Sequence, residues 1–161
     1  MIDLREFCES IGFKNVASYV QSGNLVIDSP DSEELSVVSS IERGIRERFG
    51  FEVPVIVRSK DEFQDVLEAN PFIGDQGVDE ARLCVVFLSE EPDTAKLEKI
   101  DPQEFGPDRF AVVGRHIYLH CPNGFARTKL SNNFFENRLR VTATSRNLRT
   151  VNALFDMLGQ R

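Results

Sequence analysis

The chain has 161 residues, with 26 acidic and 19 basic side chains, three cysteines and no tryptophan. A content of 41% hydrophobic and 28% charged residues is typical of a globular protein and excludes a disordered or fibrous one. No uncharged run approaches the roughly 20 residues that a membrane helix needs, and the net charge of −7 argues against a surface that tracks nucleic acid throughout.

The first residues and the cysteines indicate the compartment. Residues 1–6 carry three charges and lack the apolar stretch of a signal peptide. Cys8, Cys84 and Cys121 are odd in number and widely spaced, and no Cys-x-x-Cys pair occurs, so neither a disulfide framework nor a structural zinc site is indicated. We expect a cytoplasmic protein with no metal, no cofactor and no membrane partner.

The first half alternates helical and strand patterns. Apolar residues at helical spacing predict a helix over 3–11, and residues 16–28 are typical of a hairpin with its tight turn at Ser22-Gly23-Asn24. A second helix follows Pro30 and ends at Gly50; its predicted apolar stripe consists of Leu35, Val38, Ile41, Ile45 and Phe49. The β-branched run over 52–58 predicts a buried strand.

The second half is more regular. Apolar runs predict a helix that ends before Asn70-Pro71, a central strand over 82–89 and a hairpin over 110–121. A short helix is expected over 93–100, and a loop over 73–80. Thr128 is the predicted cap of the next helix, and a final helix starts from about Ser145.

This order predicts an α+β protein made of two ferredoxin-like (split βαβ) halves, residues 1–59 and 60–161, the first lacking its first strand. Such a strand is usually internal, so its loss leaves unpaired backbone groups, each costing about 1–3 kcal/mol when buried. We therefore expect an authentic start upstream of Met1, or a partner chain that supplies the strand. An unpaired strand edge would also permit oligomerisation.

Seven stretches, taken in order, resemble a known family. They are Tyr19-Val20-Gln21-Ser22-Gly23-Asn24, Phe49-Gly50-Phe51 with Val53-Pro54-Val55 and Arg58-Ser59, Asn70-Pro71-Phe72, Val85-Val86-Phe87-Leu88, Tyr118-Leu119-His120 with Pro122-Asn123-Gly124, Thr128-Lys129-Leu130-Ser131-Asn132, and Thr142-Ala143-Thr144-Ser145-Arg146-Asn147 with Thr150. Together they resemble domain of unknown function 1697, an uncharacterised and mainly bacterial family. The resemblance implies two ferredoxin-like halves, preceded by a strand and a glycine-containing loop that this sequence lacks. It implies no activity.

The strongest charge feature is local. Residues 127–149 contain six basic residues and one acidic residue, a net charge of +5, which leaves −12 on the rest of the chain. Two helix starts are predicted here, and helix N-termini favour phosphate or carboxylate groups. The predicted anion-binding residues are Thr128, Lys129, Asn132, Thr144, Arg146 and Asn147. Two capped helices whose basic residues pair with the acidic remainder explain the same pattern.

Three further features are open to ordinary structural explanations. Gln21, Ser22 and Asn24 are weaker ligand candidates, because their turn chemistry alone accounts for them. His116 and His120 share one strand face, but two histidines without a further ligand indicate surface or edge residues rather than a metal site. Cys121 is the only thiol that we consider for reactivity.

The sequence contains no P-loop, nucleophile elbow or His-Glu-x-x-His motif, so no catalytic residue is assigned. We therefore expect a ligand- or partner-binding module with an anion-binding patch in 127–149. The alternative is an enzyme acting on a phosphorylated or nucleotide substrate. The second alternative is nucleic-acid binding through the basic C-terminal segment, which the net charge disfavours.

Overall fold

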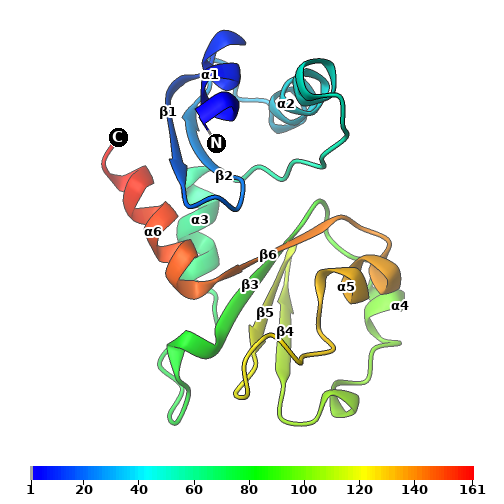
Figure 1. Cartoon of the computed structure of the whole chain (residues 1–161). Coiled ribbons are helices and arrows are strands. Elements are labelled where there is room, and N and C mark those ends of the chain that lie inside the picture. Colours follow the sequence, from blue (N-terminus) through cyan, green and yellow to red (C-terminus); the bar gives the residue numbers. More distant parts are fainter. Residues whose placement is uncertain (1) are drawn as a thin grey trace. The chain divides into compact units, whose positions relative to one another are not determined.

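The computed structural model describes residues 2–161 and has an α+β fold with two small antiparallel sheets (Figure 1). The chain divides into two compact units. The first comprises the residues up to Lys60 together with Ala153–Arg161, and the second comprises Asp61–Asn152. Whether the expected halves 1–59 and 60–161 fold as separate domains stays a prediction. Among the described residues, no helix is long and apolar enough to cross a membrane.

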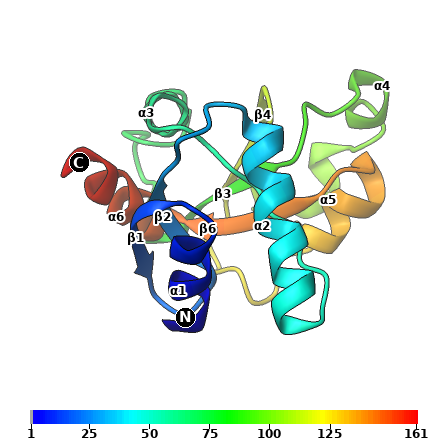
Figure 2. The same ribbon diagram turned by 90° about the horizontal axis from the view of Figure 1, so that it is seen from above.

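The first unit contains α1 (Ile2–Ser10), β1 (Lys14–Tyr19), β2 (Asn24–Asp28) and α2 (Glu34–Phe49). The two strands pair antiparallel, and α1 and α2 lie side by side (Figures 1 and 2). Gly50 ends α2 with φ 78°, a conformation that favours glycine, and its N–H donates to the carbonyl of Arg46. The predicted hairpin and the end of the second helix are therefore confirmed.

Two predictions for the first unit were wrong. Residues 51–59 are not a strand: among residues 2–161 neither sheet and no strand pair includes this segment. Pro54 lacks an N–H, and the N–H of Val55 donates instead to a Glu42 carboxylate oxygen, 2.8 Å away. Leu35 is 79% exposed, because the buried face of α2 runs through Val37, Ile41, Gly44 and Ile45.

The second unit is built on a four-stranded antiparallel sheet with strand order β4-β5-β3-β6. Its strands are β3 (Leu83–Leu88), β4 (Arg109–Val113), β5 (His116–His120) and β6 (Ala143–Asn147), and its helices are α3 (Lys60–Glu68), α4 (Thr94–Leu97), α5 (Asn132–Leu139) and the start of α6 (Leu148–Gly159). Two 3-10 turns, η1 (Glu80–Arg82) and η2 (Pro102–Phe105), precede β3 and β4. Every residue of β3 is buried, as its apolar run predicts for a central strand.

The two faces of this sheet have different neighbours. On one face Cys84, Val86 and Leu88 pack in a core with Ile117, Leu119 and residues of α5. On the other face the ring of Phe87 stacks on Phe63 of α3, with ring centroids 5.6 Å apart. The hydroxyl of Tyr118 donates to the carbonyl of Val66 over 2.8 Å, which fixes the end of α3 on this face.

The C-terminal segment differs from prediction in two places. Thr128 does not cap a helix: α5 starts at Asn132, and its cap is Ser131, whose Oγ accepts from the N–H of Phe134. Thr144 and Ser145 lie in β6 rather than at a helix start, because this polar segment pairs with β3. The final helix begins at Leu148, and the Asn147 side chain accepts from the N–H of Thr150.

Candidate functional site

The basic residues of 127–149 have different surroundings in the fold. The guanidinium of Arg138 lies 5.3 Å from the ring centroid of Phe134, and Arg140 ends α5 in a left-handed conformation. Arg146 is partly buried, and its Nη1 donates to the Thr144 hydroxyl and to the carbonyl of Ser145. Burial lowers the pKa of Arg146. Arg127 and Lys129 line one depression.

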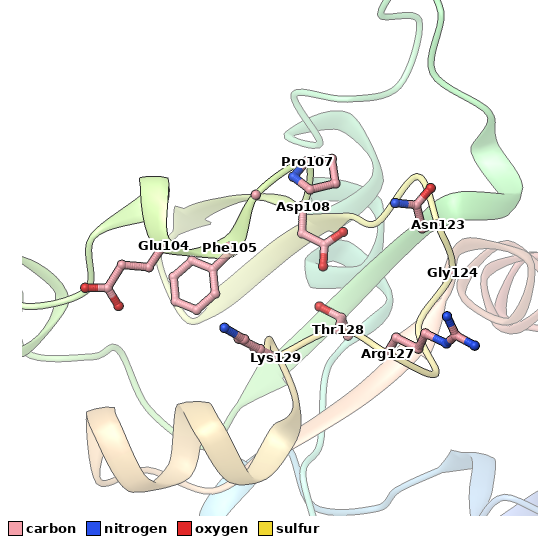
Figure 3. Close-up of a pocket in the computed structure, with 10 residues that line it drawn as sticks. Glu104, Phe105, Pro107, Asp108, Asn123, Gly124, Arg127, Thr128 and Lys129 are labelled. Atoms are coloured by element: carbon pink, nitrogen blue, oxygen red, sulfur yellow. The ribbon is translucent and has the colours of Figure 1, made fainter.

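Arg127, Thr128 and Lys129 line an open depression of about 550 Å³ in the second unit (Figure 3). One wall is the loop that contains residues 123–129, and the other is the turn at residues 104–108. This volume lies in the range of small-molecule sites, roughly 300–1,000 Å³. We call it the 104–129 depression.

Both walls are fixed by local contacts. The Asp101 side chain caps η2 by accepting from the N–H of Gln103, and the ring of Phe105 packs edge-on against Phe110 and Phe134. On the opposite wall the Thr128 hydroxyl accepts from the N–H of Leu130 and lies 3.7 Å from the Cys121 sulfur. These contacts hold the two backbones apart and leave the charged side chains at the rim.

The cations of the depression are available to a ligand. Arg127 and Lys129 are exposed, and neither forms an ion pair or a side-chain hydrogen bond with any residue in 2–161. By contrast, the depression of about 510 Å³ in the first unit is lined by three charged side chains that have partners within the unit, since Arg46 pairs with Glu52 and Glu42 binds the N–H of Val55, and by one further exposed cation, Arg43. The 104–129 depression is therefore the stronger candidate site.

The other predicted ligand residues lie elsewhere. Asn132 accepts a hydrogen bond from the Ser145 hydroxyl, beside the core under α5. Arg146 lies opposite Val85, and Thr144 lies opposite Phe87, so both are on the sheet face that α3 covers. Asn147 caps α6. The structure thus brings Thr128 and Lys129 together but does not bring the remaining four to them.

Gln21, Ser22 and Asn24 belong to the hairpin turn of the first unit. Asn24 is 7% exposed, and its Nδ2 donates to the carbonyl of Tyr19 and to the Ser22 hydroxyl. Gln21 is exposed at the tip. These hydrogen bonds of Asn24 stabilise the turn, and Gly23 adopts the positive φ of 78° that the turn requires.

The positions of the histidines and cysteines do not support a metal site or a reactive thiol. Within the described part of the chain, no three His, Cys, Asp or Glu side chains gather to hold a metal ion. His120 is 7% exposed, so describing it as a surface or edge residue was wrong. Cys121 is fully buried, and burial raises the pKa of its thiol, which disfavours the reactive thiolate.

The sequence patterns missed the acidic wall of the depression. Glu104 and Asp108 enter the site because η2 and the turn after it fold across from the 123–129 loop. Asn123 also lines the depression, and its only signal was the Pro122-Asn123-Gly124 turn. The sequence spacing of Glu104 and Asp108 does not link them to Lys129. The three residues line the same depression only because the chain folds these two segments together.

Comparison with known families supports the resemblance. The model of a family described as a protein of unknown function (DUF1697) matches residues 1–118. The chain belongs to this family. Among solved structures, the conserved bacterial protein SP0830 from Streptococcus pneumoniae is similar, with a TM-score of 0.76 and 22% identity over 99% of this chain and 88% of that chain. This DUF1697 chain therefore shares the fold of that protein, and no curated protein matches it.

Proposed function

We propose that this DUF1697 protein is a ligand-binding module whose 104–129 depression takes a small anionic ligand. The observation that carries the proposal is the pair of exposed cations, Arg127 and Lys129, which line one depression without an ion pair within residues 2–161. The Thr128 hydroxyl lies between them in sequence and can add a hydrogen bond. Hydrogen bonds from charged donors to phosphate or carboxylate are about twice as strong as neutral ones.

The test measures the binding of inorganic phosphate and of adenosine monophosphate to the protein. Calorimetric titration gives the affinity, and a rise in the melting temperature of the protein gives an independent sign of binding. We expect millimolar or tighter binding, and at least about tenfold weaker binding in Arg127→Ala/Lys129→Ala, because hydrogen bonds to charged groups contribute about 1.5–3 kcal/mol each. Arg138→Ala is the matched control, since it removes a cation that lies over Phe134 outside the depression. Unchanged affinity in the double variant would reject the site.

A second variant distinguishes the 104–129 depression from the anion-binding patch that the sequence predicted in residues 127–149. Arg146→Ala removes a partly buried cation on the sheet face that α3 covers. We expect it to change stability and to leave the affinity for phosphate unchanged. A loss of phosphate binding in Arg146→Ala with the fold intact would instead favour the full 127–149 patch.

An enzyme acting on a phosphorylated or nucleotide substrate is the alternative function. The favouring observation is the Asp108 carboxylate, which faces the Thr128 hydroxyl in the same depression (Figure 3). Turnover of a bound phosphate ester that Asp108→Asn abolishes would establish it. Nucleic-acid binding has less support, because the basic residues of 127–149 are distributed over several surfaces.

The finer fold and the compartment are part of the same proposal. The second unit runs β3, α4, β4, β5, α5, β6 with strand order β4-β5-β3-β6, which supports a ferredoxin-like module. The order α1, β1, β2, α2 in the first unit matches the middle of that arrangement.

The three cysteines are free and buried, which supports a reducing compartment such as the cytoplasm. Pairing of the β2 edge with another copy stays a prediction.

A further inference from the structure

The two walls of the 104–129 depression carry opposite charges. Glu104 and Asp108 belong to one wall, and Arg127 and Lys129 belong to the other. Figure 3 shows the Asp108 carboxylate pointing into the hollow toward Thr128, whereas Lys129 points toward Phe105 and Arg127 points toward the side of Gly124. None of these four side chains forms an ion pair with another in the part of the chain that the structure describes, although they line one hollow. A site built for a simple anion gains nothing from two carboxylates on its rim.

We propose that the ligand is a small zwitterion, with its phosphate or carboxylate group at the wall that carries Arg127 and Lys129 and a protonated amine at Asp108. This inference rests on the proposed function and adds the chemical class of the ligand. Each end of such a molecule meets charges of the opposite sign, whereas a polyanion would bring negative charge against Asp108. An aminoalkyl phosphate has this chemistry.

The walls are held apart before a ligand arrives. The N–H of Asp108 donates to the carbonyl of Phe105, and the buried Phe105 ring packs against Phe134, so the acidic wall has a fixed base. On the basic wall Gly124 has φ 90° and lies against the Arg82 side chain, 3.0 Å from where a Cβ would be. Because binding need not order these segments first, the backbone of both walls is preorganised.

Asp108 is the carboxylate that decides the preference for an amine. It is half-buried, whereas Glu104 is exposed. Its carboxylate faces the Thr128 hydroxyl across the depression (Figure 3).

The experiment compares O-phosphoethanolamine with ethyl phosphate, which has the same phosphate ester and no amine, by calorimetric titration of the full chain. We expect O-phosphoethanolamine to bind about fivefold more tightly, as expected for one partly exposed ion pair. Asp108→Asn should remove this preference and retain the binding of ethyl phosphate. Glu98→Gln, which neutralises an exposed carboxylate at the end of α4, is the control and should keep the preference.

The outcomes separate this inference from the proposed function. Equal affinities for the two ligands, with binding that Arg127→Ala/Lys129→Ala abolishes, would overturn the zwitterion and keep the anion site. A preference that persists in Asp108→Asn would also overturn it. If neither phosphate compound binds, the proposed function falls together with the inference.

Discussion

His120 shows how one buried polar side chain links a loop to the sheet. Its Nδ1 accepts from Arg109 over 3.2 Å, so the neutral ring carries its proton on Nε2. The Arg109 guanidinium also lies 4.9 Å from the ring centroid of Phe72 and 3.6 Å from an Asp75 carboxylate oxygen. Arg109 thus joins the 70–78 loop to β5.

Burial and the Arg109 charge both lower the pKa of His120 in the folded state, against opposing effects of Asp108 and Asp75. The unfolded chain, with a pKa near 6.5, binds the proton more readily, so folding is favoured most when His120 is neutral. We expect the free energy of unfolding of the second unit to fall as pH decreases below about 6.5. Urea denaturation at pH 7.5 and 5.5 measures this.

His120→Gln provides the comparison for that pH dependence. It removes the titrating ring, so the decrease between pH 7.5 and 5.5 should become smaller than in the unchanged protein. An identical pH dependence in both proteins would show that other groups cause the loss of stability.

The helix pair of the first unit depends on one glycine. Gly44 in α2 faces α1, and a Cβ at this position would lie 2.1 Å from Cζ of Phe7. The Phe7 ring is itself buried and packs edge-on against Phe49, with centroids 6.1 Å apart. Close packing of α1 on α2 therefore requires that residue 44 have no side chain.

Gly44→Ala should destabilise the first unit by about 1–3 kcal/mol, because the overpacked ring must move and this exceeds the gain in helix propensity. Gly159→Ala is the matched control: a Cβ there meets nothing within 4 Å, so we expect no loss of stability. Thermal denaturation followed by circular dichroism compares the two variants. Equal melting temperatures would contradict the packing argument.

Elements with strong local signals could be predicted from the sequence. The apolar run of β3, the stop at Gly50 and both hairpins are fixed by periodicity and turn residues close in sequence. β6 was missed because Ala143–Asn147 is polar and becomes a strand only by pairing with β3. Residues 52–58 have the β-branched residues of a strand but join neither sheet of residues 2–161.

The candidate site was predictable only where its residues are close together in the sequence. Thr128 and Lys129 are adjacent in sequence, so a local count of charge finds them. The opposing carboxylate of Asp108 reaches them only through the fold. The alternation of β6 also separates Arg146 and Ser145 onto opposite faces, which a run of basic residues cannot reveal.

At the scale of the whole molecule, the first unit uses residues from both ends of the described chain. Helix α6 begins in the second unit, and Ala153–Arg161 belong to the first. Arg161 donates to an Asp28 carboxylate oxygen over 2.9 Å and to the carbonyls of Asn15 and Val26. The Asn15 side chain and then Arg161 lower the pKa of Asp28 by hydrogen bonding.

Arg161→Gln should therefore loosen the β1–β2 hairpin. We expect amide hydrogen exchange in β1 and β2 to become about fivefold faster, since a partly exposed ion pair contributes up to about 1 kcal/mol. Exchange in β3 should stay unchanged. Arg5→Gln, an exposed cation of α1, is the control. Uniformly faster exchange in both units would show that the two unfold together, against this prediction.

The assignment of Ala153–Arg161 to the first unit has a consequence for synthesis on the ribosome. Chains emerge from the amino end, and domains generally fold in that order. Here Asp61–Asn152 are all translated before the residues that complete the first unit. The first unit must therefore wait for the codons of Ala153–Arg161, with its hairpin exposed to chaperones and proteases while Asp61–Asn152 can already be folded.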